Sequence, residues 1–479
     1  RDAPEDMWIS KVKQPLREHA YALYPLVTIA SIVIISCRIN TLSHLNAWQR
    51  IPSPWSTVVS FGDNFSDSGN GAQITGGKYP SEPWYWHHRF SNGPNWVDNL
   101  ILDLGGLGKI KMRNFAHGGA TSDNALLQGS LLGHAIPGTR QQVRGFMLKS
   151  RRTEYPKPES TLYTIWTGAN DCLAVGGVGS FGLGHKGTVK DIEESIFQNI
   201  LQLEHESHNK MKYVLVLTPP PVEDMPLVIH EGSSVRSAVQ RAAAALTHGL
   251  PQALLERLST LGHATMRDST ELAPVHPPHA LPNHRTRAPA PIAHYISVNL
   301  PQHYDHMLPG EHNGTRPTAP DDQTGPSPIS SKAPDGLHRP LLKRESIHPP
   351  STATHPKGVA AAGTVANNSR LHVMVYDAYH FIKHAEANPR CFGLDPAMMH
   401  KPCGDKKQCY DRVWIDDTNI GTQIHYWMAR DINIRLHLWH MRNTNINLDR
   451  MFKNSTRVRE LELEMLGYAC PMRQAPVLF

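Results

Sequence analysis

The chain has 479 residues, a formal net charge of +6 and a hydrophobic fraction of 40%. This composition allows a sizeable buried core, in one α/β domain with insertions or in two or three domains of average size. The positive charge is small for the length and is not gathered into a dense block of Lys and Arg, so we expect no nucleic-acid partner. The six cysteines include no Cys-x-x-Cys pair, and we therefore expect no structural zinc site. We also expect no other metal and no cofactor.

The N-terminal region, residues 1–55, has the pattern of a signal-anchor-like segment followed by a linker. Residues 21–37 carry no charge, with Lys11 and Arg17 before them and Arg38 after them. The stretch is slightly shorter than the roughly 20 residues that cross a bilayer as a helix. We interpret it as a signal peptide or a membrane anchor, which predicts a secreted or membrane-anchored protein of the secretory pathway. The alternatives are a buried helix or a mis-assigned N-terminus.

Two further patterns fit an oxidising compartment. Cys403 and Cys409 are spaced to close a small loop in such a compartment. Asn-x-Ser/Thr tripeptides, which permit glycosylation in the secretory pathway, occur at Asn64, Asn313, Asn367 and Asn454.

Residues 56–262 alternate between strand-like and helix-like patterns. Short apolar runs bounded by Gly, Pro or Asp are typical of buried parallel strands. Runs of this kind occur at 58–61, 161–166 and 213–217. Helical stretches at 190–205 and 234–261 lie among them, the second with apolar residues near the helical period. The alternation predicts a parallel sheet covered by helices on both faces.

The composition changes at His263. From there to residue 356 the chain contains 17 of its 38 prolines and 11 of its 29 histidines, without sustained periodicity. Proline removes backbone donors, and few large apolar residues remain to offset the entropy of ordering. We therefore predict that residues 263–369 are a disordered insertion; the alternative is non-coding sequence translated through a faulty gene model. The irregular spacing of the histidines does not indicate a metal site.

Regular structure is expected to resume at residues 370–430, which we predict to be the second part of the same domain. An apolar strand occupies 371–377, a loop-rich segment follows, and a helix is expected from Thr422 to Arg430. Residues 431–479 are predicted to be a C-terminal tail without chemistry.

Six sequence blocks carry the functional signal. FGDNFSDSGN at 61–70, NFAHGGATSDN at 114–124 and WTGANDCL at 166–173 each contain the small or polar residues that build a catalytic loop. The other blocks are YWHHRFSNGPNWVDNL at 85–100, TPPPVEDMP at 218–226 and VYDAYHF at 375–381. In this order, the blocks resemble the GDSL, or SGNH, ester hydrolases, and most of all the fungal-type members that include carbohydrate acetyl esterases and lipase-like enzymes.

The resemblance covers roughly 56–262 and 371–430. It implies a single three-layer α/β/α domain with a flavodoxin-like parallel sheet. It also implies hydrolysis of acyl or acetyl esters, with carbohydrate as the alcohol portion. The partner would accordingly be a small-molecule or carbohydrate ester.

The resemblance assigns the catalytic positions. Asn64 stands where the family carries its nucleophilic serine, and a carboxamide cannot be acylated as a serine can. The oxyanion donors are implied to be the backbone N–H of residue 64, the backbone N–H of Gly119 and the side-chain amide of Asn170. The family ends on Asp-x-x-His, which corresponds here to Asp416 as the orienting acid and Asn419 at the position of the base.

Two of the three working groups are therefore carboxamides. Asparagine has no useful proton affinity near neutral pH and cannot replace the histidine. Loss of a serine nucleophile or its base alone lowers turnover about a millionfold. The sequence thus predicts a family member that is impaired or inactive.

Two alternatives stay open. One is a secreted or membrane-tethered protein that binds esters or glycans without turnover, for which the aromatic stretch Trp84–Trp86 with His87 and His88 offers rings that pack at the rim of the site or stack on sugars. The other is an active esterase with a site rebuilt from Ser66 and His425.

Overall fold

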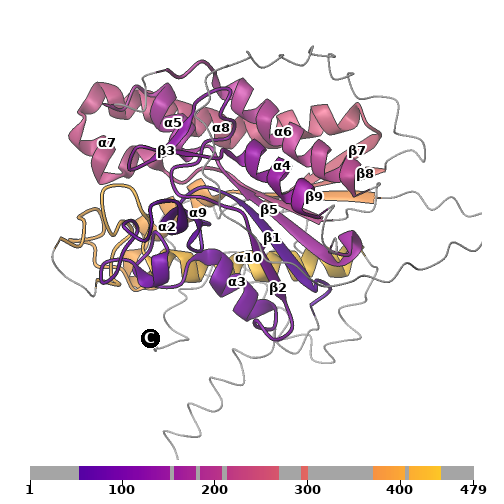
Figure 1. Cartoon of the computed structure of the whole chain (residues 1–479), viewed down its shortest axis with the longest axis horizontal. Helices are drawn as coiled ribbons and strands as arrows, with labels where there is room; N and C mark the ends of the chain where they lie inside the picture. The colour runs from indigo at the N-terminus through magenta and orange to yellow at the C-terminus, as the bar shows by residue number, and fades with distance from the viewer. Residues whose placement is uncertain are drawn as a thin grey trace, which may run out of the picture. The chain divides into compact units, whose positions relative to one another are not determined.

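The computed structural model describes residues 53–150, 156–179, 184–207, 213–268, 293–299, 370–404 and 409–443 (Figure 1). The segment 21–37, predicted to be a signal peptide or anchor, lies outside the described residues. Within the described part of the chain, no helix has the length and apolar character needed to cross a membrane.

A seven-stranded sheet forms the centre of the domain, in the order β2-β1-β5-β6-β9-β8-β7. The first five strands run parallel, while β8 pairs antiparallel with both β9 and β7. The strands are β1 (Thr57–Gly62), β2 (Lys111–Asn114), β5 (Thr161–Trp166), β6 (Tyr213–Leu217), β7 (His263–Asp268), β8 (Ala293–Asn299) and β9 (Arg370–Tyr376). Every residue of β1, β5 and β6 is buried. Burial on both faces explains why these strands form continuous apolar runs in the sequence.

Helices cover both faces of the sheet. α4, α5, α6 and α8 lie on one face, and α3 and α10 lie together on the other (Figure 1). The helices are α2 (Asn70–Ile74), α3 (Trp96–Leu104), α4 (Thr139–Ser150), α5 (Ala169–Val175), α6 (Val189–Glu206), α7 (Pro226–His230), α8 (Ser233–Ser259), α9 (Ala378–Ala387) and α10 (Thr422–Asn443). A small hairpin, β3 (Gly129–Leu131) with β4 (His134–Ile136), stands apart from the main sheet. The predicted three-layer α/β/α fold with a mostly parallel sheet is confirmed.

Two strands lie inside the segment that the sequence predicted to be disordered. β7 and β8 continue the sheet beyond β9, so the prediction for 263–369 is wrong at 263–268 and 293–299. β8 contains no proline and buries Ala293, Ile296 and Val298, so it has both the donors and the apolar side chains that a strand needs. The high average proline content concealed it. The rest of the predicted insertion lies outside the described residues.

The last helix is longer than predicted. α10 continues past Arg430 to Asn443, because Met428, Ile432 and Leu436 recur at helical spacing and are buried. The prediction of a tail from residue 431 is therefore wrong for 431–443. Residues 444–479 lie outside the described part of the chain.

The topology determines where functional side chains collect. β1, β5, β6 and β9 are parallel, so the loops that follow their carboxyl ends meet at one edge of the sheet. Those loops begin with the sequence blocks at Gly62, Trp166, Thr218 and Tyr376.

Candidate active site

Asn64 lies in a tight turn at the carboxyl end of β1. The turn is closed by hydrogen bonds from Ser66 N to Asp63 O (3.1 Å) and from Phe65 N to Asp63 Oδ1 (3.2 Å). The ring of Phe65 packs on Trp166, with 4.9 Å between ring centroids. This packing buries Phe65 and leaves Asn64 partly exposed, so its carboxamide is the group that the turn presents.

Asp67 connects this turn to the glycine loop. Its Oδ1 accepts from the backbone N–H groups of Gly69 and Asn70, both at 2.7 Å, and its Oδ2 accepts from those of Gly71 (2.8 Å) and Gly118 (2.7 Å). Burial raises the pKa of Asp67, and the backbone donors oppose that rise. A buried carboxylate with four backbone donors thus fixes Gly118, and with it Gly119, beside residue 64.

Gly119 is a position that only glycine can occupy. Its φ is +79°, and a Cβ would come within 2.2 Å of the carbonyl oxygen of Ser130. Its N–H donates to Asn64 Oδ1 at 3.0 Å. The backbone donor that the resemblance assigned to the oxyanion hole therefore points at the side chain of residue 64.

A continuous line of hydrogen bonds joins the predicted positions. Asn64 Nδ2 donates to Asn419 Oδ1 at 3.0 Å, and Asn419 Nδ2 donates to Asp416 Oδ2 at 2.9 Å. With the bond from Gly119 N to Asn64 Oδ1, the hydrogen bonds form one series in which both asparagine oxygens accept and both asparagine nitrogens donate. The structure thus brings Asn64, Gly119, Asp416 and Asn419 together, although 355 positions separate Asn64 from Asn419 along the chain.

Asn170 is placed differently. It is buried at the start of α5, and its Nδ2 donates to the carbonyl oxygen of Ala120 at 2.7 Å. This bond holds the chain directly after Gly119. Its assigned role as a donor to an oxyanion stays a prediction.

The loop carrying Asp416 and Asn419 is rigidly built. Asp416 Oδ1 accepts from the backbone N–H groups of Thr418 (2.8 Å) and Asn419 (2.7 Å). Ile415 N donates to Asn419 O at 2.9 Å, and an isolated antiparallel bridge joins Trp414 to Ile420. The two backbone bonds orient the carboxylate of Asp416 within its own loop.

Sequence analysis placed Tyr85 in an aromatic stretch at the rim of the site but did not predict its contact with Asp416. Its hydroxyl donates to Asp416 Oδ2 at 2.7 Å and lies 3.1 Å from the hydroxyl of Tyr79. On either side of Tyr85 in the sequence, Trp84 and Trp86 are 41% and 36% exposed. Tyr85 lies within a recognised sequence block, but only the folded chain shows that it reaches the acid.

Ser66 and His425, the candidates for a rebuilt site, are not brought together. The Ser66 side chain is fully buried and its Oγ accepts from Trp96 Nε1 at 3.1 Å. The ring of His425 packs edge-on against Trp166, and neither ring nitrogen has a hydrogen-bond partner among the described residues. Burial lowers the pKa of His425 to about 3. The geometry gives this pair no means of passing a proton.

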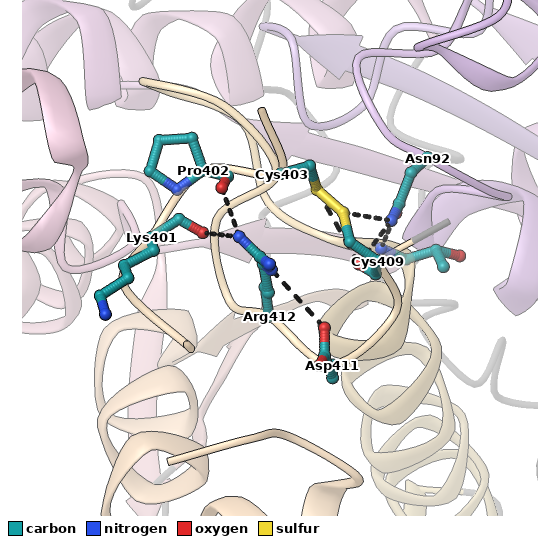
Figure 2. Close-up of a disulfide and its surroundings, with 8 residues drawn as sticks. Asn92, Lys401, Pro402, Cys403, Cys409, Asp411 and Arg412 are labelled. Carbon is teal, nitrogen blue, oxygen red and sulfur yellow. Dashed lines mark hydrogen bonds and ion pairs between the residues drawn. A yellow bond between two sulfur atoms is a disulfide. The ribbon is translucent and has the colours of Figure 1, made fainter. Parts of the chain in front are cut away.

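The disulfide Cys403–Cys409 supports the same loop (Figure 2). Cys403 N donates to Ile415 O at 2.8 Å, next to Asp416. Asn92 Nδ2 donates to Cys409 O at 3.0 Å while Asn92 Oδ1 accepts from Thr422 N at 2.9 Å. The disulfide loop is thus bonded to both ends of the segment that contains Asp416 and Asn419.

Arg412 contacts the chain just before Cys403 in the disulfide loop. Its buried guanidinium donates to the carbonyl oxygens of Lys401, at 2.8 Å, and of Pro402 (Figure 2).

Among the described residues, no group of three or more His, Cys, Asp or Glu side chains is arranged to hold a metal ion.

The parallel sheet, its loops and the line of residues from Gly119 to Asp416 define the SGNH-hydrolase class of α/β/α proteins. The sequence profile of the GDSL-like lipase/acylhydrolase family matches residues 58–338, more than half of the chain. The chain belongs to this family, as the sequence blocks predicted.

Two curated relatives are similar over a limited stretch. A phosphatidylcholine-sterol acyltransferase of Aeromonas hydrophila is 35% identical over 123 residues, which cover 26% of this chain and 34% of that protein. A thermolabile hemolysin of Vibrio parahaemolyticus is 29% identical over 123 residues, covering 26% and 27%. The similarity thus spans about a third or less of the length of these relatives.

Solved structures are similar at a lower level. A GDSL-like lipase of Parabacteroides merdae shows 14% identity and a TM-score of 0.25, covering 42% of this chain and 75% of that one.

Proposed function

We propose that this chain is an impaired ester hydrolase: it binds acyl or acetyl esters, with carbohydrate as the alcohol portion, and hydrolyses them poorly or not at all. The observation that carries the proposal is the double engagement of the Asn64 carboxamide. Its oxygen accepts from Gly119 N and its nitrogen donates to Asn419 Oδ1, each at 3.0 Å.

The chemistry of this arrangement opposes turnover. An acyl transfer needs a nucleophile that becomes covalently attached and a base that removes its proton. Neither carboxamide supplies these functions. The Asn64 oxygen also accepts the hydrogen bond of the Gly119 N–H, the donor that would otherwise face the developing oxyanion. A substrate carbonyl must displace the Asn64 oxygen before Gly119 N–H can stabilise the oxyanion.

The expected kinetic behaviour follows from how triad residues act. Because the nucleophile and base work as a unit, removing both costs little more than removing one. A residual enhancement of roughly 10³–10⁴ over water can survive from oxyanion donors and binding.

The test is a double reversion. Asn64→Ser/Asn419→His should raise kcat/KM on p-nitrophenyl acetate by at least about a thousandfold over the wild-type chain, because it restores both functions beside an intact Asp416. Each single variant should stay near the wild-type rate and serves as the control. A double variant no faster than the single variants, or a wild-type chain that is already fast, would overturn the proposal. Phospholipid and acetylated-oligosaccharide substrates then distinguish the alcohol portion.

A second candidate is a protein that binds ester or glycan ligands without turnover. The exposed rings of Trp84 and Trp86 support it, because they flank the residue that contacts Asp416, and exposed indoles suit stacking on a sugar face. Calorimetry with an acetylated oligosaccharide should show binding that Trp84→Ala/Trp86→Ala weakens by about tenfold or more. Equal binding by the wild-type chain and this variant would count against it.

We also propose that the protein enters the secretory pathway and is secreted or membrane-anchored through residues 21–37. The Cys403–Cys409 disulfide supports this, since such bonds persist in oxidising compartments. Expression in a eukaryotic host should yield protein in the medium or membrane fraction, and deletion of 21–37 should retain it in the cytosol. Export that is unaffected by the deletion would contradict the assignment.

A further inference from the structure

The carboxylate of Asp416 accepts four hydrogen bonds. Its Oδ1 accepts from the backbone N–H groups of Thr418 and Asn419, and its Oδ2 accepts from Asn419 Nδ2 at 2.9 Å and from the Tyr85 hydroxyl at 2.7 Å. A carboxylate offers about four acceptor positions, so this one is saturated. The bond from Tyr85 is the only one of the four that comes from outside the loop of Asp416.

The loop that carries Tyr85 is anchored on both sides. The ring of Tyr85 packs edge-on against Tyr79, at 5.3 Å between centroids, and near Phe90 at 6.3 Å. Arg89 forms two hydrogen bonds with Asp98 of α3, at 3.1 and 3.0 Å. The hydroxyl of Tyr85 is thus delivered to Asp416 by a supported ring and not by a loose side chain.

We propose that Tyr85 is a positioning residue for Asp416: it holds Oδ2 toward residue 419 and takes up part of the carboxylate's charge. This rests on the proposed function only in treating residues 64, 416 and 419 as the catalytic positions. The site then depends on a fourth residue besides these three positions. This residue, Tyr85 in the loop after α2, sets how strongly the Asp416 carboxylate stabilises a positive charge at position 419.

Tyr85 is suited to this role at any working pH. Burial and the neighbouring carboxylate of Asp416 raise the pKa of Tyr85, so its hydroxyl stays protonated and remains a donor. Burial also raises the pKa of Tyr79, which keeps the second hydroxyl in the line neutral. A neutral donor reduces the negative charge that Asp416 presents to an imidazolium, without cancelling it.

The test places an imidazole beside Asp416 and titrates it without any turnover. NMR gives the pKa of the imidazole at position 419 in Asn419→His and in Asn419→His/Tyr85→Phe. Without the Tyr85 hydroxyl, one hydrogen bond to the Asp416 carboxylate is lost, and its negative charge acts more strongly on the imidazole. The charged imidazolium is then favoured, so the pKa of the imidazole should rise by about 0.5 to 1 unit, a three- to tenfold gain in proton affinity. Tyr79 interacts with residue 419 and with the charge of Asp417, and both Tyr79 and Asp417 are unchanged in this comparison.

Asn419→His/Trp84→Phe is the matched control, because it alters an exposed ring of the same loop and leaves the hydroxyls of Tyr79 and Tyr85 in place. Its shift should be less than half as large. An unchanged or lowered pKa in the Tyr85 variant, or equal shifts in the two variants, would overturn the proposal. Because the readout is a titration, a failure of the double reversion to restore hydrolysis leaves this result intact.

Discussion

At the scale of single residues, two carboxamides stand at the positions that the resemblance assigns to a nucleophile and a base, and each forms hydrogen bonds through both its oxygen and its nitrogen. Asn64 links Gly119 to Asn419, and Asn419 links Asn64 to Asp416. An unmatched buried amide would cost about 1–3 kcal/mol. Along that line, the oxygen of Asn64 and the oxygen of Asn419 each accept a hydrogen bond, and the nitrogen of each donates one.

The sequence predicted which residues meet here, because ordered blocks fixed positions 64, 119, 416 and 419 by resemblance. It did not predict what each side chain bonds to. The contact from Tyr85 to Asp416 spans 331 positions, and the bond from Asn170 to Ala120 depends on how α5 lies against the glycine loop. Such contacts depend on tertiary packing, which periodicity and motif spacing do not encode.

His425 gives a prediction about acid stability. Its pKa is about 3 in the folded chain because burial disfavours the charged ring, whereas an unfolded histidine has a pKa of about 6.5. The unfolded state therefore binds a proton that the folded state rejects, and stability present above pH 6.5 is lost as the pH falls toward 3. Between pH 6.5 and 5 this group should cost about 1.6 kcal/mol of unfolding free energy.

Urea unfolding of the wild-type chain and of His425→Leu checks this. Between pH 6.5 and 5, the unfolding free energy of the variant should fall by less than that of the wild-type chain, and the difference should equal the cost given for His425. Measurement at pH 8, where the ring is neutral in both states, gives the packing effect of the substitution by itself. Identical acid sensitivity in the two proteins would show that His425 is not buried as a neutral ring.

At the scale of secondary structure, four of the five parallel strands, the helices α6 and α8 and the start of α10 follow from their sequence patterns, whereas β2 and the other described helices were not predicted. β1, β5, β6 and β9 were predictable because strands buried on both faces leave continuous apolar runs. β8 was missed because its apolar residues are embedded in proline-rich sequence, and its strand character depends on pairing with β9. The end of α10 was missed because histidines and polar residues interrupt its apolar face, although Leu436 and Trp439 are buried.

The Cys403–Cys409 disulfide should stabilise the segment from Ile415 to Thr422. Closing so short a loop is worth roughly 2 kcal/mol in the chain-entropy description. In Cys403→Ser/Cys409→Ser we expect backbone amides of 414–421 to exchange hydrogen at least about tenfold faster, because Ile415 O and Asn92 lose fixed partners.

Hydrogen exchange followed by mass spectrometry measures this, with the amides of β6 as the internal reference. Asn92→Ala is the comparison variant, since it keeps the disulfide and the bond from Cys403 N to Ile415 O, and removes the bonds of Asn92 to Cys409 O and Thr422 N. It should loosen the Thr422 end alone. Unchanged protection of 414–421 in the double serine variant would mean that the loop is held without the disulfide.

At the scale of the whole molecule, the family profile covers residues 58–338, and the sheet draws strands from both sides of the proline-rich sequence. In the β8–β9 pair, Asn299 lies directly opposite Arg370. The two strands therefore have the geometry of a hairpin whose ends a short turn can join.

This register predicts that residues 300–369 can be replaced by a short turn such as Asn-Gly. The shortened chain should fold, and its melting temperature should stay within about 5 °C of the full-length value, because the β8–β9 hydrogen bonds need only a local connection. Calorimetry of the two chains measures the difference. A shortened chain that fails to fold would show that the replaced residues are needed for the sheet.

The most direct test of the proposal that the site is impaired is covalent labelling with a fluorophosphonate, read out by mass spectrometry of the peptide that spans β1 and the turn after it. The wild-type chain should take no label, since Asn64 has no hydroxyl to phosphonylate and Ser66 is buried against Trp96. Asn64→Ser/Asn419→His should be labelled at position 64. Stoichiometric labelling of the wild-type chain at Ser66 or any other serine would contradict the assignment.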